Sequence, residues 1–332
     1  YTTEHTLSLH DALPICTGYA RWLFASNVVI TLLFLQNAIF RGAGDPMLAL
    51  KCLTVSNGLN LILDPCFVFG LGPFPQLGVT GAAVATCTGR GIAVLYQFWL
   101  LRRGNGRVRL ERLVRFDLEP MRKMIKLSLG TIGQFLIGTS SWIGLMWGVN
   151  RFGEAATAGY TIGIRILIFA LLPAWGLSNA AATLVGQNLG AKQPDRAERA
   201  VWLTGAYDAA FLAVVTLVAE LFAPQIVALF TVDPAIAAHA VATLRIVAAG
   251  YVFFAWGMVT VQAFNGAGDT VTPTWLHAIF FWMLQLPMAW WLAFGLDFGM
   301  SGILWMIPAT ESLFAVAAVL LFRRGRWKRV VV

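Results

Sequence analysis

The chain has 332 residues, of which 58% are hydrophobic and only 12% are charged, and its formal net charge is +8. Soluble domains carry about 25% charged residues, so this composition excludes an ordinary soluble protein. Apolar runs of about 20 residues recur along the chain, and each is long enough to cross a hydrocarbon core about 30 Å thick. The sequence therefore predicts an all-α integral membrane protein.

The first fifteen residues, YTTEHTLSLHDALPI, have mixed polarity and are not part of a periodic hydrophobic pattern. They lack the basic start and apolar centre of a secretory signal. The stretch TLSLHDALPI also resembles a translated sequencing adapter. We expect residues 1–15 to be non-native, and the alternative is a short extramembrane segment of the natural protein.

Hydropathy and helix breakers predict nine membrane spans in the rest of the chain. The spans lie at 19–40, 47–69, 78–101, 128–150, 156–187, 201–230, 240–264, 274–297 and 300–322. Gly-rich and Pro-rich breaks separate them, such as GAGDP at 42–46 and NLGAKQPD at 188–195.

The basic residues fall on one side of this arrangement. Alternate loops hold 19 of the 24 Lys and Arg residues, and these loops lie near 41–51, 102–127, 188–199, 265–273 and 323–332. Such alternation follows the positive-inside rule and predicts a cytoplasmic C-terminus. The basic charge is therefore expected to face the cytoplasm and the lipid bilayer, not a nucleic acid.

An internal repeat relates two parts of the chain. FRGAGD at 40–45 aligns with FNGAGD at 264–269 at an offset of 224, and six predicted spans separate the two copies. An even number of spans makes the repeat parallel, which is one known transporter architecture. We expect residues 16–115 to form the last three helices of an N-lobe and residues 116–332 a complete six-helix C-lobe. The fold predicted is thus a two-lobed bundle with nine of its twelve helices present.

The GAGD elements are expected to be tight helix connections, because a phosphate loop would need a following Lys-Ser/Thr pair. FRGAGDP, NGLNLILD (57–64) and FGLGPFPQLGVTGAAVAT (69–86) resemble the fourth to sixth helices of the multidrug and toxin extrusion (MATE) family. LVGQNLGAKQPDRAERA (184–200) and FNGAGDTVTPTW (264–275) resemble later elements in family order.

This resemblance implies an N-terminally truncated MATE transporter of the DinF-like branch. Such a protein is a multi-pass antiporter of the inner membrane that exports cationic or amphipathic compounds in exchange for H⁺ or Na⁺ by alternating access. The resemblance also implies about three further helices upstream.

The span 47–69 carries the strongest candidate site. Four polar residues at helical spacing share one face of it: Thr54, Asn57, Asn60 and Asp64. A carboxylate at membrane depth is costly and usually marks an ion or proton pathway. Pro65 also leaves the carbonyl oxygen of Leu61 without its helical partner.

The MATE resemblance implies that Asn60 and Asp64 are the ion-binding pair of the DinF-like branch. Thr80 and Thr86 are weaker candidates for completing the site from the next helix. The alternative is structural: Asp64 pairs with Arg90, and Asn60 makes a helix–helix hydrogen bond. The corresponding segment of the second copy, 283–287, has no acid. This favours proton coupling through the first lobe, with Na⁺ left open.

Three further charges within predicted spans are candidates for a role inside the membrane. Arg90 and Glu311 occupy equivalent positions of the two copies at an offset of 221. They are expected either to face one another across the cavity or to pair locally, and Arg165 is a candidate local partner of Glu311. Structural pairing within the membrane is the favoured interpretation.

Aromatic and methionine residues gather at 251–258 and 280–291. Aromatic faces and thioethers suit flat amphipathic cations. The candidate substrate-cavity residues are Trp256, Met258, Phe281 and Met283. Aromatic residues also decorate lipid-facing surfaces, which is the alternative for this group.

No catalytic motif accompanies these features. His239 and His277 lack a neighbouring serine or cysteine motif, and HExxH is absent. The four cysteines lack CxxC spacing, so neither a disulfide framework nor a metal site is expected. We therefore expect a monomeric transporter with small-molecule substrates and no cofactor apart from its coupling ion. The alternatives are a lipid-linked oligosaccharide flippase of the same superfamily and a membrane enzyme.

Overall fold

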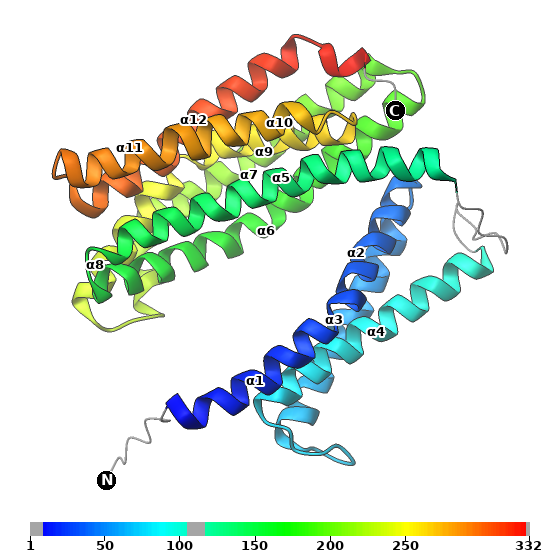
Figure 1. The fold of residues 1–332 in the computed structure, drawn as a ribbon, viewed down its shortest axis with the longest axis horizontal. Helices are drawn as coiled ribbons and strands as arrows, with labels where there is room; N and C mark the ends of the chain where they lie inside the picture. The colour runs from blue at the N-terminus through cyan, green and yellow to red at the C-terminus, as the bar shows by residue number, and fades with distance from the viewer. Residues whose placement is uncertain (1–8, 105–116, 330–332) are drawn as a thin grey trace. The chain divides into compact units, whose positions relative to one another are not determined.

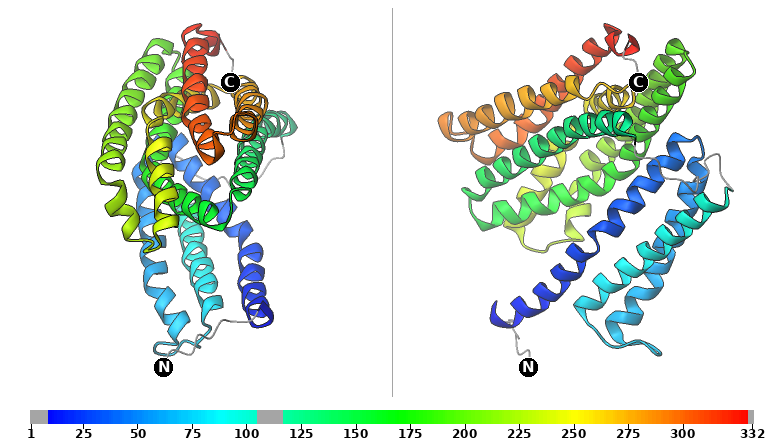
Figure 2. Two further views of the ribbon diagram at one scale, coloured as in Figure 1. Left: turned by 90° about the vertical axis from the view of Figure 1, so that its left-hand side faces the viewer. Right: turned by 45° about the vertical axis from the view of Figure 1, so that its right-hand side comes forward.

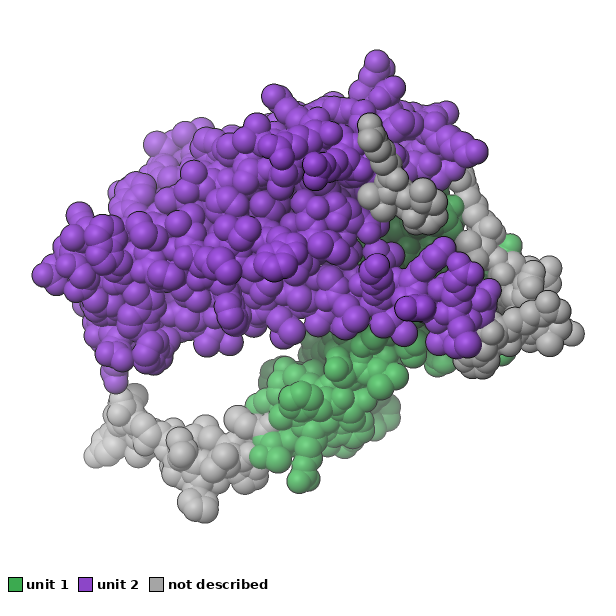
Figure 3. Space-filling view, turned by 45° about the horizontal axis from the view of Figure 1, so that its top comes forward, with its two compact units in different colours: residues 1–116 green, residues 117–332 purple. Residues whose placement is uncertain are grey.

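The computed structural model describes residues 9–104 and 117–329. Within these ranges every regular element is helical (Figure 1), so the predicted all-α fold is confirmed. The chain divides into two compact units, residues 1–116 and residues 117–332 (Figure 3). Each unit has its own helix packing.

The described part of unit 1, residues 9–104, contains four helices: α1 (Leu9–Ala25), α2 (Asn27–Gly42), α3 (Pro46–Phe69) and α4 (Val79–Arg103). Two glycines of α4 let its backbone approach that of α3. A Cβ atom at Gly81 would lie 2.4 Å from the carbonyl oxygen of Phe67, and one at Gly89 would lie 3.1 Å from that of Ser56. Small residues permit this close packing of membrane helices, and it fixes the register of α3 against α4.

The α-helices of unit 2 range in length from 5 to 37 residues. They are α5 (Leu118–Asn150), α6 (Glu154–Gly190), α7 (Pro194–Ala228), α8 (Pro234–Ala248), α9 (Tyr251–Gly266), α10 (Val271–His277), α11 (Leu286–Trp290) and α12 (Gly299–Arg323). Two π-helical segments, η1 (Ala278–Gln285) and η2 (Trp291–Gly295), flank α11, and the 3₁₀ helix η3 (Arg326–Arg329) follows α12. α6 packs against α7, α8 and α9, and α12 packs against α8 and α9 (Figure 2). The core of the unit is apolar and includes Leu145, Val149, Leu167, Leu212, Leu244, Ile303 and Leu304.

Each of the nine predicted spans coincides with a helix or with adjoining helices. Five are long and apolar enough to cross a membrane: α3, α6, α7, the run Val271–Gly295, and α12. The number is seven if each of two bent helix pairs is one span. The predicted spans 78–101 and 128–150 form α4 and α5, which are helical but less apolar. Arg90 lies within α4, and basic residues begin α5.

Two predicted spans are not continuous helices. The span 19–40 is bent by 41° between α1 and α2, and the span 240–264 is bent by 55° between α8 and α9. The second bend occurs at Gly250, where a Cβ atom would lie 2.6 Å from the Cβ of Pro308. The close approach of α12 thus requires glycine at this bend. Periodicity alone did not predict either break.

The two GAGD elements form the same turn. In the first, the amide of Asp45 donates to the carbonyl of Phe40, and the Asp45 carboxylate accepts from the amide of Leu48. In the second, Asp269 donates to Phe264 and accepts from the amide of Thr272. The preceding glycines have φ of 83° and 82°. Each Asp therefore caps the next helix, and the predicted tight helix connections are present.

The segment after α12 folds back onto unit 2. The Trp327 side chain is buried, stacks on Phe322, and donates its indole N–H to the Phe322 carbonyl at 3.0 Å. Lys328 Nζ lies 2.6 Å from Glu198 and 3.2 Å from Asp195 of α7. The hydrogen bond that Lys328 donates to Glu198 raises the pKa of the Lys328 ammonium, so this link between η3 and α7 stays charged at neutral pH.

Some predictions fall on undescribed residues. Residues 1–8 of the expected non-native segment lie outside the described ranges, whereas the backbone of residues 9–15 belongs to α1. The basic stretch 102–127 is described only at its ends, and 105–116 lies outside. The non-native origin of residues 1–15 stays a prediction.

Candidate functional site

A polar cluster lies between α3 and α4 of unit 1. The side-chain amide nitrogen of Asn60 lies 3.4 Å from Asp64 Oδ1 and 3.1 Å from the Thr86 hydroxyl oxygen. The opposite amide orientation gives better-matched partners, because the nitrogen then donates to Asp64 Oδ2 at 3.2 Å and the oxygen accepts from the Thr86 hydroxyl at 3.1 Å. In either orientation the three side chains form one hydrogen-bonded group.

Helix geometry and close packing both build this cluster. Asn60 and Asp64 are four residues apart and so share one face of α3. A Cβ atom at Gly89 would lie 3.3 Å from the Asn60 backbone nitrogen, and the absent side chain lets α4 carry Thr86 up to Asn60. Carboxylate, amide and hydroxyl oxygens together can hold a proton or a hard cation.

Three other predicted residues of unit 1 lie outside the cluster. Thr54 and Asn57 are exposed, and the Thr54 hydroxyl donates to the Leu50 carbonyl of its own helix at 3.0 Å. Arg90 is partly buried in α4. Within the described ranges no ion pair joins Arg90 to Asp64. The structural alternative for Asp64, pairing with Arg90, is therefore not seen.

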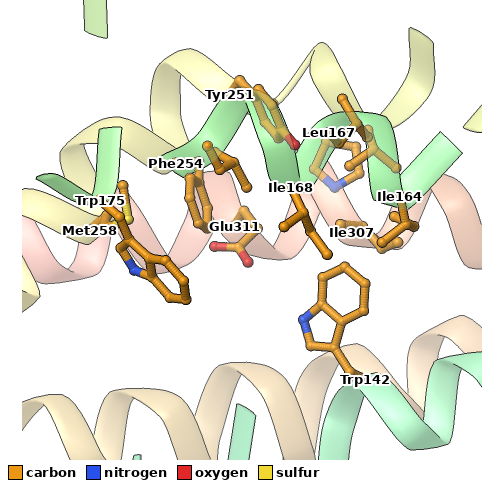
Figure 4. A pocket seen from close by; sticks show the side chains of 14 residues that line it. Trp142, Ile164, Leu167, Ile168, Trp175, Tyr251, Phe254, Met258, Ile307 and Glu311 are labelled. Carbon is orange, nitrogen blue, oxygen red and sulfur yellow. The ribbon is translucent and has the colours of Figure 1, made fainter. Parts of the chain in front are cut away.

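Unit 2 contains a cavity of about 270 Å³ (Figure 4). Side chains of α5, α6, α8, α9 and α12 line it, and most of them are aromatic or aliphatic. Glu311 of α12 is the one charged residue among the described residues that line the cavity. Figure 4 shows its carboxylate directed into the space bordered by Trp142 and Trp175.

Glu311 also borders a second, smaller cavity of about 40 Å³. There the hydroxyl of Ser141 donates to the Gln285 side-chain oxygen at 2.9 Å. Arg165, the predicted local partner of Glu311, is exposed on α6, and the described residues include no ion pair between the two. Arg90 and Glu311 belong to different units.

Two of the four predicted substrate-cavity residues line a cavity, and the other two do not. Met258 lines the larger cavity and Phe281 the smaller one. Trp256 faces α7 instead, since its ring lies 5.7 Å from that of Trp202. Met283 is exposed and lines neither cavity.

Sequence reasoning missed two features. The cavity aromatics Trp142, Trp175 and Tyr251 were not chosen, because their helical spacing is the same as that of core or lipid-facing residues. Asp208 of α7 is fully buried, and neither carboxylate oxygen has a hydrogen-bond partner within the described residues. Its position in the middle of an apolar span was the available signal.

The chain is similar to known transporters over nearly its whole length. It is 26% identical over 319 residues to the "FAD transporter" of Shewanella oneidensis, with 94% of this chain and 69% of that protein aligned. It is 26% identical over 317 residues to the "Probable multidrug resistance protein NorM" of Thermotoga maritima, covering 94% and 67%. The crystal structure of "MATE in the straight conformation" superposes with a TM-score of 0.88 at 25% identity, covering 96% and 71%.

The apolar helices, the partly buried polar cluster and these relatives define a multi-pass membrane transporter. The MatE family model matches residues 131–291. The chain is therefore similar to transporters of the MATE family, as the sequence predicted. The DinF-like branch stays a prediction.

Proposed function

We propose that the protein is an antiporter that exports cationic or amphipathic small molecules in exchange for H⁺ or Na⁺, with Asp64 in its coupling site. The hydrogen-bonded group of Asn60, Asp64 and Thr86 carries this proposal. Asn60 and Asp64 lie on α3, which is long and apolar enough to span a membrane. A carboxylate kept in such a helix is expensive and is generally retained for function.

The cluster suggests how an ion would change the protein. With Asp64 ionised, the Asn60 amide donates to the carboxylate, and the Thr86 hydroxyl donates to the Asn60 oxygen and so links Asn60 to α4. A proton on Asp64, or a cation bound by its oxygens, changes what Asn60 and Thr86 can donate and accept. Occupancy would therefore alter the contact between α3 and α4 and favour one access state of the transporter over the other. Proton coupling is the preferred form, with Na⁺ as the second.

A second candidate is export of an organic anion, because one relative is named an FAD transporter. The charge in the cavity of unit 2 argues against it for this chain. The described lining residues of that cavity include a carboxylate and no Lys or Arg. This arrangement favours a cationic substrate over an anionic one.

The test is export of a cationic dye from cells that lack their own exporters, with wild-type protein and Asp64→Asn. Asp64→Asn keeps the size of the side chain and removes its charge. Asp297→Asn is the matched control, because Asp297 is an exposed loop carboxylate at φ 57°, a conformation that asparagine also tolerates.

We expect Asp64→Asn to abolish export driven by an ion gradient at unchanged protein level, and Asp297→Asn to leave it intact. Equal export by wild type and Asp64→Asn would remove Asp64 from the mechanism. If the wild type exports no cationic dye, export of FAD and flipping of a lipid-linked oligosaccharide are the assays that separate the alternatives.

A further inference from the structure

The cavity around Glu311 lies within unit 2 and is distinct from the α3–α4 polar cluster. Its volume of about 270 Å³ is close to the lower end of the range for pockets that bind small organic molecules. The helices that line it also pack against one another in the unit's core. The cavity is therefore a feature of one folded unit.

Glu311 has no polar partner in this cavity. No hydrogen bond or ion pair joins its carboxylate to another residue within the described ranges, although most intramembrane acids are paired. An unpaired carboxylate away from bulk water is costly unless a positive charge accompanies it. The cavity itself leaves room for the missing partner.

The walls indicate which kind of cation fits. Trp142 and Trp175 stand on either side of the carboxylate in Figure 4, and Tyr251 and Phe254 add two further rings. Aromatic faces attract organic cations, and the Met258 thioether adapts to irregular apolar shapes. A hard metal cation would instead need about six oxygen ligands. Only the Glu311 carboxylate and the Tyr251 hydroxyl supply side-chain oxygen among the described lining residues.

We propose that this cavity binds a small organic monocation with an aromatic body, with Glu311 as its counter-charge and Trp142 and Trp175 as flanking walls. The proposal rests on the proposed export function, for which it names a substrate class and a site in unit 2. It adds a binding determinant on α12 that is separate from the ion coupling at Asp64.

The test is equilibrium binding to the purified full chain by titration calorimetry, which needs no ion gradient. The probe is benzyltrimethylammonium, and its comparison compound is neopentylbenzene, which has the same shape without the charge. Glu311→Gln removes the counter-charge and keeps the side-chain size. We expect Glu311→Gln to weaken binding of the cation about ten-fold or more and to leave binding of the neutral compound unchanged.

A second pair of variants guards against a folding defect in Glu311→Gln. Trp175→Leu removes a half-exposed ring from the cavity wall, whereas Trp305→Leu removes an exposed ring of α12 that does not line it. We expect only Trp175→Leu to weaken binding of the cation. Equal affinity of wild type, Glu311→Gln and Trp175→Leu for the cation would overturn the proposal, as would equal affinity of the wild type for the two compounds.

Failure of this proposal and failure of the proposed function give different results. Asp64→Asn should bind the cation as the wild type does, even though it exports nothing. If instead export depends on Asp64 while Glu311→Gln binds normally, the coupling site stands and the Glu311 cavity is excluded as the cation site.

Discussion

Asp208 is a buried carboxyl group for which the described residues supply no hydrogen bond. Removing a polar group that makes no hydrogen bond loses little, and an apolar group of similar size can be neutral or stabilising. We expect Asp208→Val either to leave the free energy of unfolding unchanged or to raise it by roughly 1 kcal/mol, and so not to lower the thermal unfolding temperature. Differential scanning fluorimetry in detergent measures this.

Asp269→Ala is the contrasting control. The Asp269 carboxylate accepts hydrogen bonds from the amide and the hydroxyl of Thr272. Its loss removes a helix cap, which costs about 1 kcal/mol. A drop of several degrees for Asp208→Val, as large as that for Asp269→Ala, would contradict the assignment of Asp208 as an unpartnered group.

Single residues also show how far the sequence predicts the site. The spacing of Asn60 and Asp64 within one helix sufficed to place them together. The choice between Thr80 and Thr86 depended on the register between α3 and α4, which the sequence left open and which Gly89 sets in the structure. The setting of Glu311 was not predictable from spacing, because residues from five helices enclose the cavity.

At the scale of elements, the effect of a Gly→Ala substitution on stability should have the opposite sign at Gly250 from the one that helix propensity predicts. Gly→Ala inside a helix normally stabilises by about 0.5–1 kcal/mol. At Gly250 the added methyl group would lie 2.6 Å from Pro308 Cβ and 2.8 Å from its Cα. We expect Gly250→Ala to destabilise by about 1–3 kcal/mol, because overpacking forces α9 and α12 apart.

The control for this prediction is Gly176→Ala, at a helical position of α6 where an added Cβ atom meets nothing within 4 Å. We expect it to be neutral or stabilising. Thermal unfolding of both variants decides the matter, and equal stability of Gly250→Ala and Gly176→Ala would show that α12 yields readily at the bend.

Elements were predicted well in position and less well in shape. The nine apolar segments all form helices, because long apolar runs leave the backbone few other ways to satisfy its hydrogen bonds in lipid. The π-helical turns before and after α11 were not predicted. Pro287 lies between them and lacks a backbone N–H, so the hydrogen-bond register must change locally. Periodicity at 3.6 residues cannot reveal such a change.

At the scale of the whole molecule, the loop charges predict the orientation in the membrane. We expect the turn near Ala191 to face the cytoplasm and the turn near Val232, where the side chain is 97% exposed, to face outward. In a background without the native cysteines, a membrane-impermeant maleimide added to intact cells should label Val232→Cys and not Ala191→Cys. The reverse labelling pattern would invert the proposed topology.

The repeat that the sequence suggested at GAGD extends to the helix bends. The offset of 224 that relates the two GAGD elements also relates Ser26, between α1 and α2, to Gly250, between α8 and α9. Only the turn sequence was recognisable beforehand, because Ser26 and Gly250 share no side-chain chemistry. At this position the two copies share a bend in the backbone and not a side-chain type.

These bends have a consequence for how the protein enters the membrane during synthesis. α2 and α9 each have 16 residues and α8 has 15, so each is only about 22–24 Å long, shorter than the hydrocarbon core. Neither half of a bent pair can therefore be integrated alone by the insertion machinery. We expect each pair to partition into lipid as one unit, so an added charge at the centre of either half should weaken the integration of both halves.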